Sequence, residues 1–384
     1  MDHPNLQVIV AGAGIGGLTA AIALAQRGHQ VRVLERAPAI QPVGAGLTVQ
    51  INAMRALTRL GVADAVAHAG QVVTHASIRH WRGDVISQNN LGAMAESLGA
   101  PTVAIHRAEL HRVLMEALPD VPVQLGAEVK RFDQDDRGVR VTLTDGTLLT
   151  GDVLIAADGI HSAIRAQLHG KQPPQYAGYT SWRGVCDNHG LMDPEHVSET
   201  WGDAQRFGLV PLGQGRLYWF AVADAPQGEK DPMDVQEALL RRFDGWHAPI
   251  ARVLKGTHQK DILRTDICDR PPLTRWGEGR VTLLGDAAHP MTPNLGQGAC
   301  MAIEDAVVLA SALGEQSNPA HALQLYATRR VERTATVVTT ARRFGRLGQW
   351  SNPAARAVRD AVLHAAPESL TEKQMRWLYQ FDGA

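Results

Sequence analysis

The stretch VIVAGAGIGGLTAAIALAQRGHQVRVLE (residues 8–35) holds a strand, a glycine-rich turn, a helix and a second strand in succession. The apolar run at 8–11 predicts a buried parallel strand, and the residues at 18–26 predict a helix that Gly28 stops. A second strand is predicted at 31–34. Together these segments predict one βαβ unit, and its crossover is expected to be right-handed.

Three glycines of the turn, Gly12, Gly14 and Gly17, are spaced as G-x-G-x-x-G. The first permits a tight turn, the second lets the backbone approach a diphosphate, and the third lets helix and strand pack closely. The helix N-terminus adds free N–H groups and a partial positive charge. Glu35, at the end of the second strand, can accept hydrogen bonds from an adenosine ribose. The pattern predicts a dinucleotide site rather than a purely structural turn, and it does not separate NAD from FAD.

The rest of the chain predicts an α/β fold in which a second, mixed sheet interrupts the nucleotide-binding sheet. Alternating residues around Gly83-Asp84 and aromatic-rich stretches later in the chain indicate this second sheet. The predicted elements are a hairpin at 75–88, a helix at 108–118, three short strands at 122–155, sheet strands at 176–224 and 260–268, a buried parallel strand at 280–284, and mainly helices thereafter.

Composition narrows the classes of function. Of the 384 residues, 45% are hydrophobic and 20% charged, and 38 basic against 39 acidic side chains give a formal charge of -1. This balance gives no electrostatic support for a nucleic-acid or membrane-surface partner. Neither a secretory signal nor an apolar run of membrane-spanning length is evident. Cys186, Cys268 and Cys300 lack metal-type or redox-pair spacing, so we expect core thiols in a cytoplasmic protein.

Two later loops each follow a predicted buried strand. The first is DGIHSAIR (158–165), and the second is GDAAHP (285–290), which leads into PNLGQG (293–298). Together with the glycine turn, these loops resemble the three signature motifs of the single-component FAD-dependent aromatic hydroxylases. These enzymes are the p-hydroxybenzoate hydroxylase-like group A flavoprotein monooxygenases. The order and spacing match along nearly the whole chain, and GRLGQW (345–350) resembles the bacterial members of the group.

The resemblance implies a Rossmann-like FAD-binding domain of the glutathione-reductase type, with an inserted mixed β-sheet substrate domain and C-terminal helices. The expected bounds are 1–74, 100–175 and 270–320 for the discontinuous FAD-binding domain, 75–99 and 176–269 for the substrate-binding sheet domain, and 321–384 for the C-terminal helical region.

The resemblance also implies which residues hold FAD. Asp286 can reach a ribityl hydroxyl, Arg107 can meet the diphosphate, and the helix expected at about 299–313 can stabilise negative charge on the reduced flavin. The segment 43–46 resembles the one that runs under the flavin ring, and Asp158 is expected to help admit NAD(P)H. A solvated charge at Arg107 and a turn-capping role for Asp158 are the alternatives. The expected cofactor-binding residues are Gly12, Gly14, Gly17, Glu35, Arg36, Gly46, Arg107, Asp158, Asp286, Gly296, Gln297 and Gly298.

In this family, reduced FAD combines with oxygen to form a flavin hydroperoxide, whose distal oxygen attacks an electron-rich carbon. The resemblance therefore implies an NAD(P)H- and O2-dependent monooxygenase that hydroxylates an aromatic or conjugated ring, with NADH or NADPH as a transient co-substrate. Pro293 is expected beside the flavin edge, and Arg206 and Tyr218 are the expected substrate contacts on the second sheet. A surface arginine and a core tyrosine are the alternatives, and no metal is expected. Asn294 departs from the aspartate of the urate-hydroxylating branch, which disfavours a purine substrate.

Other activities share this fold. A flavin-dependent epoxidase and an isoprenoid-type reductase are alternatives, and a non-catalytic FAD-binding regulator is the alternative from another class. A halogenase would carry a Trp-x-Trp-x-Ile-Pro segment, which the sequence lacks. His289 is expected to order its loop rather than to act as a base. The expected partners are a small aromatic substrate, O2 and NAD(P)H, bound by a monomer or homodimer.

Overall fold

The glycine-rich stretch folds into the predicted βαβ unit. The computed structural model describes residues 5–40, 45–231 and 233–381. β1 (Gln7–Ala11) pairs in parallel with β2 (Gln30–Glu35). α1 (Ile15–Ala25) connects the two strands and is buried along most of its length, because its residues are small or aliphatic. The prediction for residues 8–35 is therefore confirmed.

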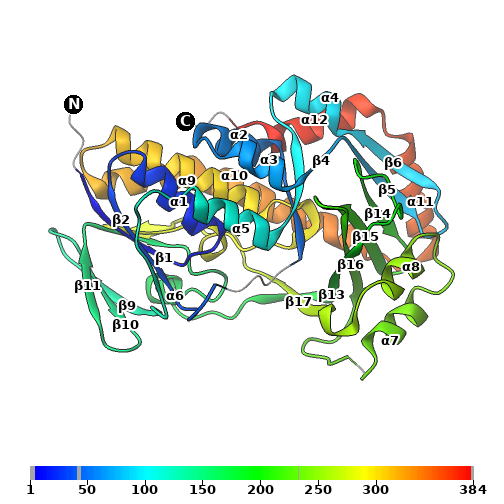
Figure 1. The fold of residues 1–384 in the computed structure, drawn as a ribbon, viewed down its shortest axis with the longest axis horizontal. Coiled ribbons are helices and arrows are strands. Elements are labelled where there is room, and N and C mark those ends of the chain that lie inside the picture. Colours follow the sequence, from blue (N-terminus) through cyan, green and yellow to red (C-terminus); the bar gives the residue numbers. More distant parts are fainter. Residues whose placement is uncertain (1–4, 41–44, 232, 382–384) are drawn as a thin grey trace.

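β1 and β2 belong to a six-stranded central sheet with the order β18–β19–β12–β1–β2–β8. Every pair in this sheet is parallel except β18–β19. α9 (Gly298–Glu315) packs along α1 on this sheet (Figure 1), which confirms the helix predicted at about 299–313. The remaining strands are β8 (Val123–Leu125), β12 (Val153–Ala156), β18 (Gly277–Glu278) and β19 (Val281–Leu283).

The region at 122–155 contains five strands, so the prediction of three was wrong. β8 and β12 join the central sheet, and the three strands between them form a separate antiparallel sheet, which projects at one end of the molecule in Figure 1. The strand ends that the prediction missed lie at Gly126, which has a φ of 67°, and at Gly151, where Asp152 alone separates two strands. Because only one residue lies between these two strands, the sequence there contains no turn motif that would reveal the change from one sheet to the other. The three strands are β9 (Val129–Gln134), β10 (Val139–Leu143) and β11 (Leu148–Gly151).

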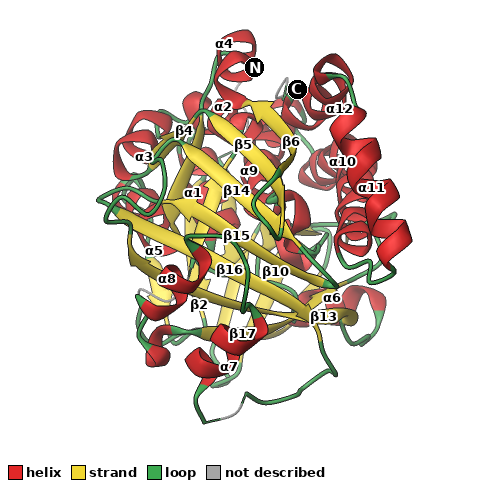
Figure 2. Ribbon diagram, turned by 90° about the vertical axis from the view of Figure 1, so that its right-hand side faces the viewer, coloured by secondary structure: helices red, strands yellow, loops and turns green. Residues whose placement is uncertain are grey.

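The second sheet is mixed, as predicted, and has the order β17–β13–β16–β15–β14–β5–β6. Its β14–β5 pair is parallel, and β5 and β6 form the predicted hairpin. One face packs on α7 (Val235–Arg242) and α8 (Ile250–Lys255) through a cluster that includes Trp182, Phe207 and Trp219 (Figure 2). The opposite face is turned toward the central sheet. The strands are β5 (His75–His80), β6 (Val85–Asn90), β13 (Gln175–Asp187), β14 (His196–Trp201), β15 (Gln205–Pro211), β16 (Arg216–Asp224) and β17 (Leu263–Asp269).

The helices after residue 318 pack against both parts of the fold. α10 (Pro319–Gly348) packs along α9, α11 (Pro353–Ala365) lies beside β6, and α12 (Glu368–Tyr379) contacts α2 and α4 (Figures 1 and 2). No helix in the described ranges is both long and apolar enough to cross a membrane. The elements not yet given are β3 (Gly46–Val49), β4 (Gln71–Val73) and β7 (Thr102–His106), which form a small sheet, and the helices α2 (Ile51–Arg59), α3 (Ala63–Ala69), α4 (Leu91–Leu98), α5 (Arg107–Glu116) and α6 (Ala163–His169).

Candidate active site

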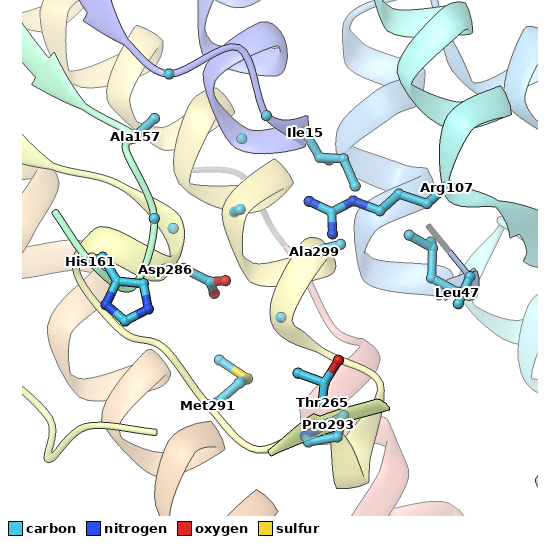
Figure 3. Close-up of a pocket in the computed structure, with 18 of the residues that line it drawn as sticks. Ile15, Leu47, Arg107, Ala157, His161, Thr265, Asp286, Met291, Pro293 and Ala299 are labelled. Carbon is cyan, nitrogen blue, oxygen red and sulfur yellow. The ribbon is translucent and has the colours of Figure 1, made fainter. Parts of the chain in front are cut away.

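A cavity of about 760 Å³ lies between the central sheet and the second sheet. Its wall is formed by the ends of β1 and β12, by β3, by the start of α9 and by one face of β13, β15 and β16. The carboxyl ends of parallel strands are where open α/β sheets bind ligands. Figure 3 shows Arg107 and Asp286 extending into this space from opposite walls.

The glycine turn contains two kinds of glycine. Gly12 has a φ of 106°, and a Cβ there would stand 2.4 Å from the carbonyl oxygen of Ala157. A Cβ at Gly17 would stand 1.9 Å from the Gly12 oxygen, so Gly17 serves the packing of α1 on β1 and does not line the cavity. Gly14 does line it, and no atom lies within 4 Å of the position of its Cβ. No described side chain caps α1 at Gly14, so the first N–H groups of the helix are free to bind a diphosphate.

Glu35 and Arg36 lie on the cavity wall at the end of β2. Glu35 Oε2 accepts a hydrogen bond from the backbone N–H of Ala13 at 2.8 Å, and Oε1 accepts one from Ala37 at 2.9 Å. These bonds fix the carboxylate beside the glycine turn, and each oxygen keeps a lone pair for a ligand hydroxyl. The position fits the ribose of an adenosine.

Arg107 and Asp158 reach the cavity from the start of α5 and from the loop after β12. Within the described ranges the Arg107 guanidinium makes no ion pair, and it points into the cavity (Figure 3). Asp158 Oδ2 accepts a hydrogen bond from Ala163 N at 3.0 Å and so stabilises the start of α6, which is the capping role considered as the alternative. Its Oδ1 is buried without a partner in the described part of the chain, and burial raises the pKa of this carboxyl. A buried acceptor beside a cavity is a place for a ligand donor.

The loop before α9 presents Asp286, Gly296 and Gly298 to the cavity. Asp286 is accessible through the cavity. Burial by the protein atoms around its carboxyl nevertheless raises the pKa of this group. Gly296 has a φ of 64°, and a Cβ there would stand 2.7 Å from Gln50 Nε2. No described side chain caps α9, so the positive end of this long helix faces the cavity and favours negative charge there.

The side chain of Gln297 is turned away from the cavity and is fully buried. Its Oε1 accepts a hydrogen bond from Asn52 Nδ2 at 3.0 Å, and its Nε2 donates to Gln50 Oε1. Among the residues predicted to bind the cofactor, Gln297 therefore differs from Asp286 and Gly298. Its side chain fixes the loop against α2 instead of lining the cavity.

A buried ion-pair network, which no sequence motif predicts, supports the same loop. Asp305 Oδ2 accepts a hydrogen bond from Gly285 N at 3.0 Å and lies 2.6 Å from His289 Nε2. Asp305 Oδ1 accepts from Arg330 Nε at 2.7 Å, and Arg330 also pairs with Glu304. Burial opposes ionisation of Asp305, but the charges of His289 and Arg330 hold its pKa below the usual value. His289 thus orders the loop, as expected, and is not part of the cavity wall.

The other end of the cavity is formed by the second sheet and the loop at Pro293 (Figure 3). Arg206 lines it but is only 1% exposed, and its buried charge is satisfied within the protein: Nη1 pairs with Glu199 Oε1 at 3.0 Å, and Nη2 donates to Asn294 Oδ1 at 2.8 Å. The structure therefore brings Arg206 and Pro293 together, and it corrects the alternative of a surface arginine.

Tyr218 lies where the two ends of the cavity meet. Its ring packs against Gly46 of β3, where a Cβ would stand 2.5 Å from Tyr218 Cγ. The side chain is buried, and burial raises the pKa of the phenol to about 12, so the group stays protonated and can donate a hydrogen bond. Gly46 thus lines the cavity. It belongs to the segment 43–46 that is expected to run under the flavin ring, and residues 43 and 44 of this segment lie outside the described ranges.

The two ends of the cavity combine a dinucleotide-type site with a pocket on an aromatic-rich sheet, an arrangement that is expected of a flavoprotein monooxygenase. The chain matches the FAD binding domain family over residues 5–341, and it belongs to this family.

Relatives of known activity agree with this class. The chain is 46% identical over 377 residues to the aurachin C monooxygenase/isomerase of Stigmatella aurantiaca, with 98% of each chain covered. It is 37% identical over 342 residues to an FAD-dependent urate hydroxylase of Klebsiella pneumoniae, covering 88% of this chain and 89% of the relative. The crystal structure of Klebsiella pneumoniae HpxO with FAD and uric acid superposes with a TM-score of 0.93 at 32% identity, covering 98% of this chain and 97% of the other.

The protein is therefore an FAD-dependent monooxygenase that hydroxylates an aromatic or conjugated ring, and the predicted α/β FAD-binding fold is confirmed. The open helix ends, the glycine cradle at Gly14 and the unpartnered Asp158 oxygen fit a bound FAD. When bound, FAD supplies the redox chemistry and the activation of oxygen. The chain binds and orients the reactants and excludes water from them.

Proposed function

We propose that this monooxygenase uses NAD(P)H and O2 to oxygenate a planar ring compound bound between Arg206, Tyr218 and Pro293. The observation that carries the proposal is one continuous cavity whose wall runs from Gly14 to Arg206. A ring at the second sheet then lies next to the isoalloxazine of an FAD whose diphosphate is at Gly14. Such proximity is what oxygen transfer between two bound molecules requires.

Within this proposal, each part of FAD has a protein partner. The start of α1 at Gly14 binds the diphosphate together with Arg107, and Glu35 binds the adenosine ribose, flanked by Arg36. Asp286 binds the ribityl chain. The positive end of α9 stabilises charge on the pyrimidine edge of the flavin.

The candidate substrate is aurachin C. Support comes from the 46% identity to the aurachin C enzyme, which spans 98% of both chains and exceeds the 37% identity to the urate hydroxylase. The pocket agrees with a substrate other than urate, because the Asn294 amide is already used. Its Nδ2 donates to Tyr179 Oη at 2.8 Å and to the Ala341 oxygen at 2.9 Å, while its Oδ1 accepts from Arg206.

A substrate panel tests the proposal. Purified, FAD-loaded protein is mixed with NADH or NADPH and with aurachin C, urate or 3-hydroxybenzoate, and both O2 uptake and NAD(P)H oxidation are followed. We expect aurachin C to stimulate both rates most and to yield a product that is one oxygen atom heavier. NAD(P)H oxidation without O2 uptake would indicate a reductase, and no response to any compound would favour a non-catalytic FAD-binding protein.

We also propose that the protein works in the cytoplasm, where NAD(P)H is available to it. The state of its thiols is compatible with a reducing compartment, because Cys186, Cys268 and Cys300 are all free. Labelling of intact cells and fractions with an antibody to the chain checks this location.

A further inference from the structure

Arg183 is a charged residue of the cavity wall that has no partner of its own among residues 5–40, 45–231 and 233–381. It lies on β13, half-buried, on the face of the sheet opposite to Trp182. Among the described residues its guanidinium makes no ion pair and no hydrogen bond, whereas Arg206 is neutralised by Glu199 at 3.0 Å. No sequence motif predicts Arg183 as a functional residue.

The register of the sheet places Arg183 beside Tyr218. Arg183 is opposite Phe220, and Val185 is opposite Tyr218, so Arg183 and Tyr218 are diagonal neighbours on one face. Burial raises the pKa of the Tyr218 phenol, and the nearby charge of Arg183 acts against this rise. Within the described part of the chain, the Tyr218 hydroxyl also lacks a hydrogen-bond partner. A free cation and a free hydroxyl therefore point into the same part of the cavity.

A flat apolar surface lies next to these two groups. A Cβ at Gly208 would stand 2.0 Å from Phe220 Cε1, so the absence of a side chain there lets the Phe220 ring lie against the backbone of β15. Phe220 lines the cavity between Arg183 and Gly208. The wall thus offers one aromatic face for stacking beside one unpaired positive charge.

A cation on a cavity wall that no described side chain neutralises is available to an anionic group of a ligand. Two other cations of the cavity wall, Arg36 and Arg107, also make no ion pair among the described residues, and both are at the dinucleotide end, where the proposed FAD faces them. Arg183 is left as the unneutralised cation at the substrate end of the described wall. A guanidinium pairs with carboxylates and ring oxyanions through two parallel hydrogen bonds.

We infer that Arg183 is a specificity-determining residue that selects substrates with a carboxylate or an oxyanion on the ring, and that Tyr218 donates a hydrogen bond to the same group. This inference rests on the proposed function, since it assigns the substrate end of the same cavity. It names a chemical feature that the substrate must carry, whatever the rest of its structure.

Two probes of nearly the same shape test the inference. Salicylate carries a carboxylate, and salicylamide replaces it with a neutral amide. Binding of each probe to the FAD-loaded protein is measured by titration calorimetry for the wild type, Arg183→Gln, Arg183→Lys and Arg252→Gln. The last variant removes an exposed charge on α8, away from the cavity, and is the matched control.

We expect the wild type to bind salicylate roughly tenfold or more tightly than salicylamide, as a charge-assisted pair implies. Arg183→Gln should abolish this preference, Arg183→Lys should keep part of it, and Arg252→Gln should keep all of it. A wild type without the preference, or an Arg183→Gln variant that retains it, overturns the inference. Protein that cannot be loaded with FAD contradicts the proposed function instead, so the two failures are distinguishable.

Discussion

Gly348 lies in contact with Arg206: a Cβ added at Gly348 would stand 2.7 Å from Arg206 Cδ. The last turn of α10 therefore makes room for the arginine, and the next residue, Gln349, accepts a hydrogen bond from Arg206 Nε at 2.9 Å. The GRLGQW motif at 345–350 thus helps to hold the Arg206 guanidinium in place, together with Glu199 and Asn294.

Replacing Gly348 by Ala should displace Arg206 and raise the apparent KM for substrate, because the new methyl group cannot fit beside Cδ. We expect a rise of roughly tenfold, corresponding to one weakened hydrogen bond to a charged group, with unchanged FAD content. Arg206→Ala should act in the same direction and more strongly. Steady-state kinetics and the flavin-to-protein absorbance ratio check this, and loss of FAD in either variant would assign the pair to folding or cofactor support.

Substitutions of two glycines in the first turn should affect FAD binding and folding separately. Gly14→Ala adds a methyl group to open space on the cavity wall, so the chain should fold normally and bind FAD more weakly. Gly17→Ala adds a methyl group 1.9 Å from the Gly12 oxygen, so the apoprotein itself should lose stability. Thermal unfolding without FAD and FAD titration measure the two effects. Equal loss of apoprotein stability in both variants would refute the distinction.

Removing the Glu35 carboxylate should weaken FAD binding. Glu35→Ala is expected to cost about 1.5–3 kcal/mol of FAD binding free energy, the size of a hydrogen bond to a charged group. The measurement is the dissociation constant of FAD from fluorescence titration of the apoprotein. Glu96→Ala, at an exposed position on α4, is the control and should leave it unchanged. An unaltered affinity in Glu35→Ala would argue against the ribose role.

The buried ion-pair network of Glu304, Asp305 and Arg330, which supports the loop before α9, should contribute far more to stability than a surface ion pair. Arg330→Met removes the buried guanidinium that Glu304 and Asp305 share, so that, among charged partners, Glu304 keeps only Arg333 and Asp305 keeps only His289. This loss should cost about 3–5 kcal/mol of unfolding free energy. Glu315→Gln breaks the more exposed pair with Arg329 and should cost less than about 1 kcal/mol. Urea unfolding of the two variants measures both values. Similar costs for the two would show that the network does not hold the loop.

The sequence predicted the parts of the site that depend on local backbone geometry. Gly12, Gly14 and Glu35 are positioned by the strand, turn and helix on which they lie, so their spacing alone was informative. Gln297 belongs to an equally clear motif, but the direction of its side chain depends on Asn52, more than 200 residues away in the chain.

Contacts between distant segments left no such signal. Glu304 and Arg330 pair across two helices, and Arg183 lies beside Tyr218 only because of the register between β13 and β16. Likewise, the five strands at 122–155 could not be separated, because the change of sheet at Gly151 depends on pairing with β1 and not on a turn.

The transfer of oxygen to a ring in this cavity is tested most directly by isotope labelling. The FAD-loaded protein is supplied with NAD(P)H, ¹⁸O2 and the compound of the panel that stimulates O2 uptake most. The product is then analysed by mass spectrometry. We predict the incorporation of one ¹⁸O atom from O2 and none from water. A reduced product without the label, or no stimulated uptake with any compound, would contradict the account.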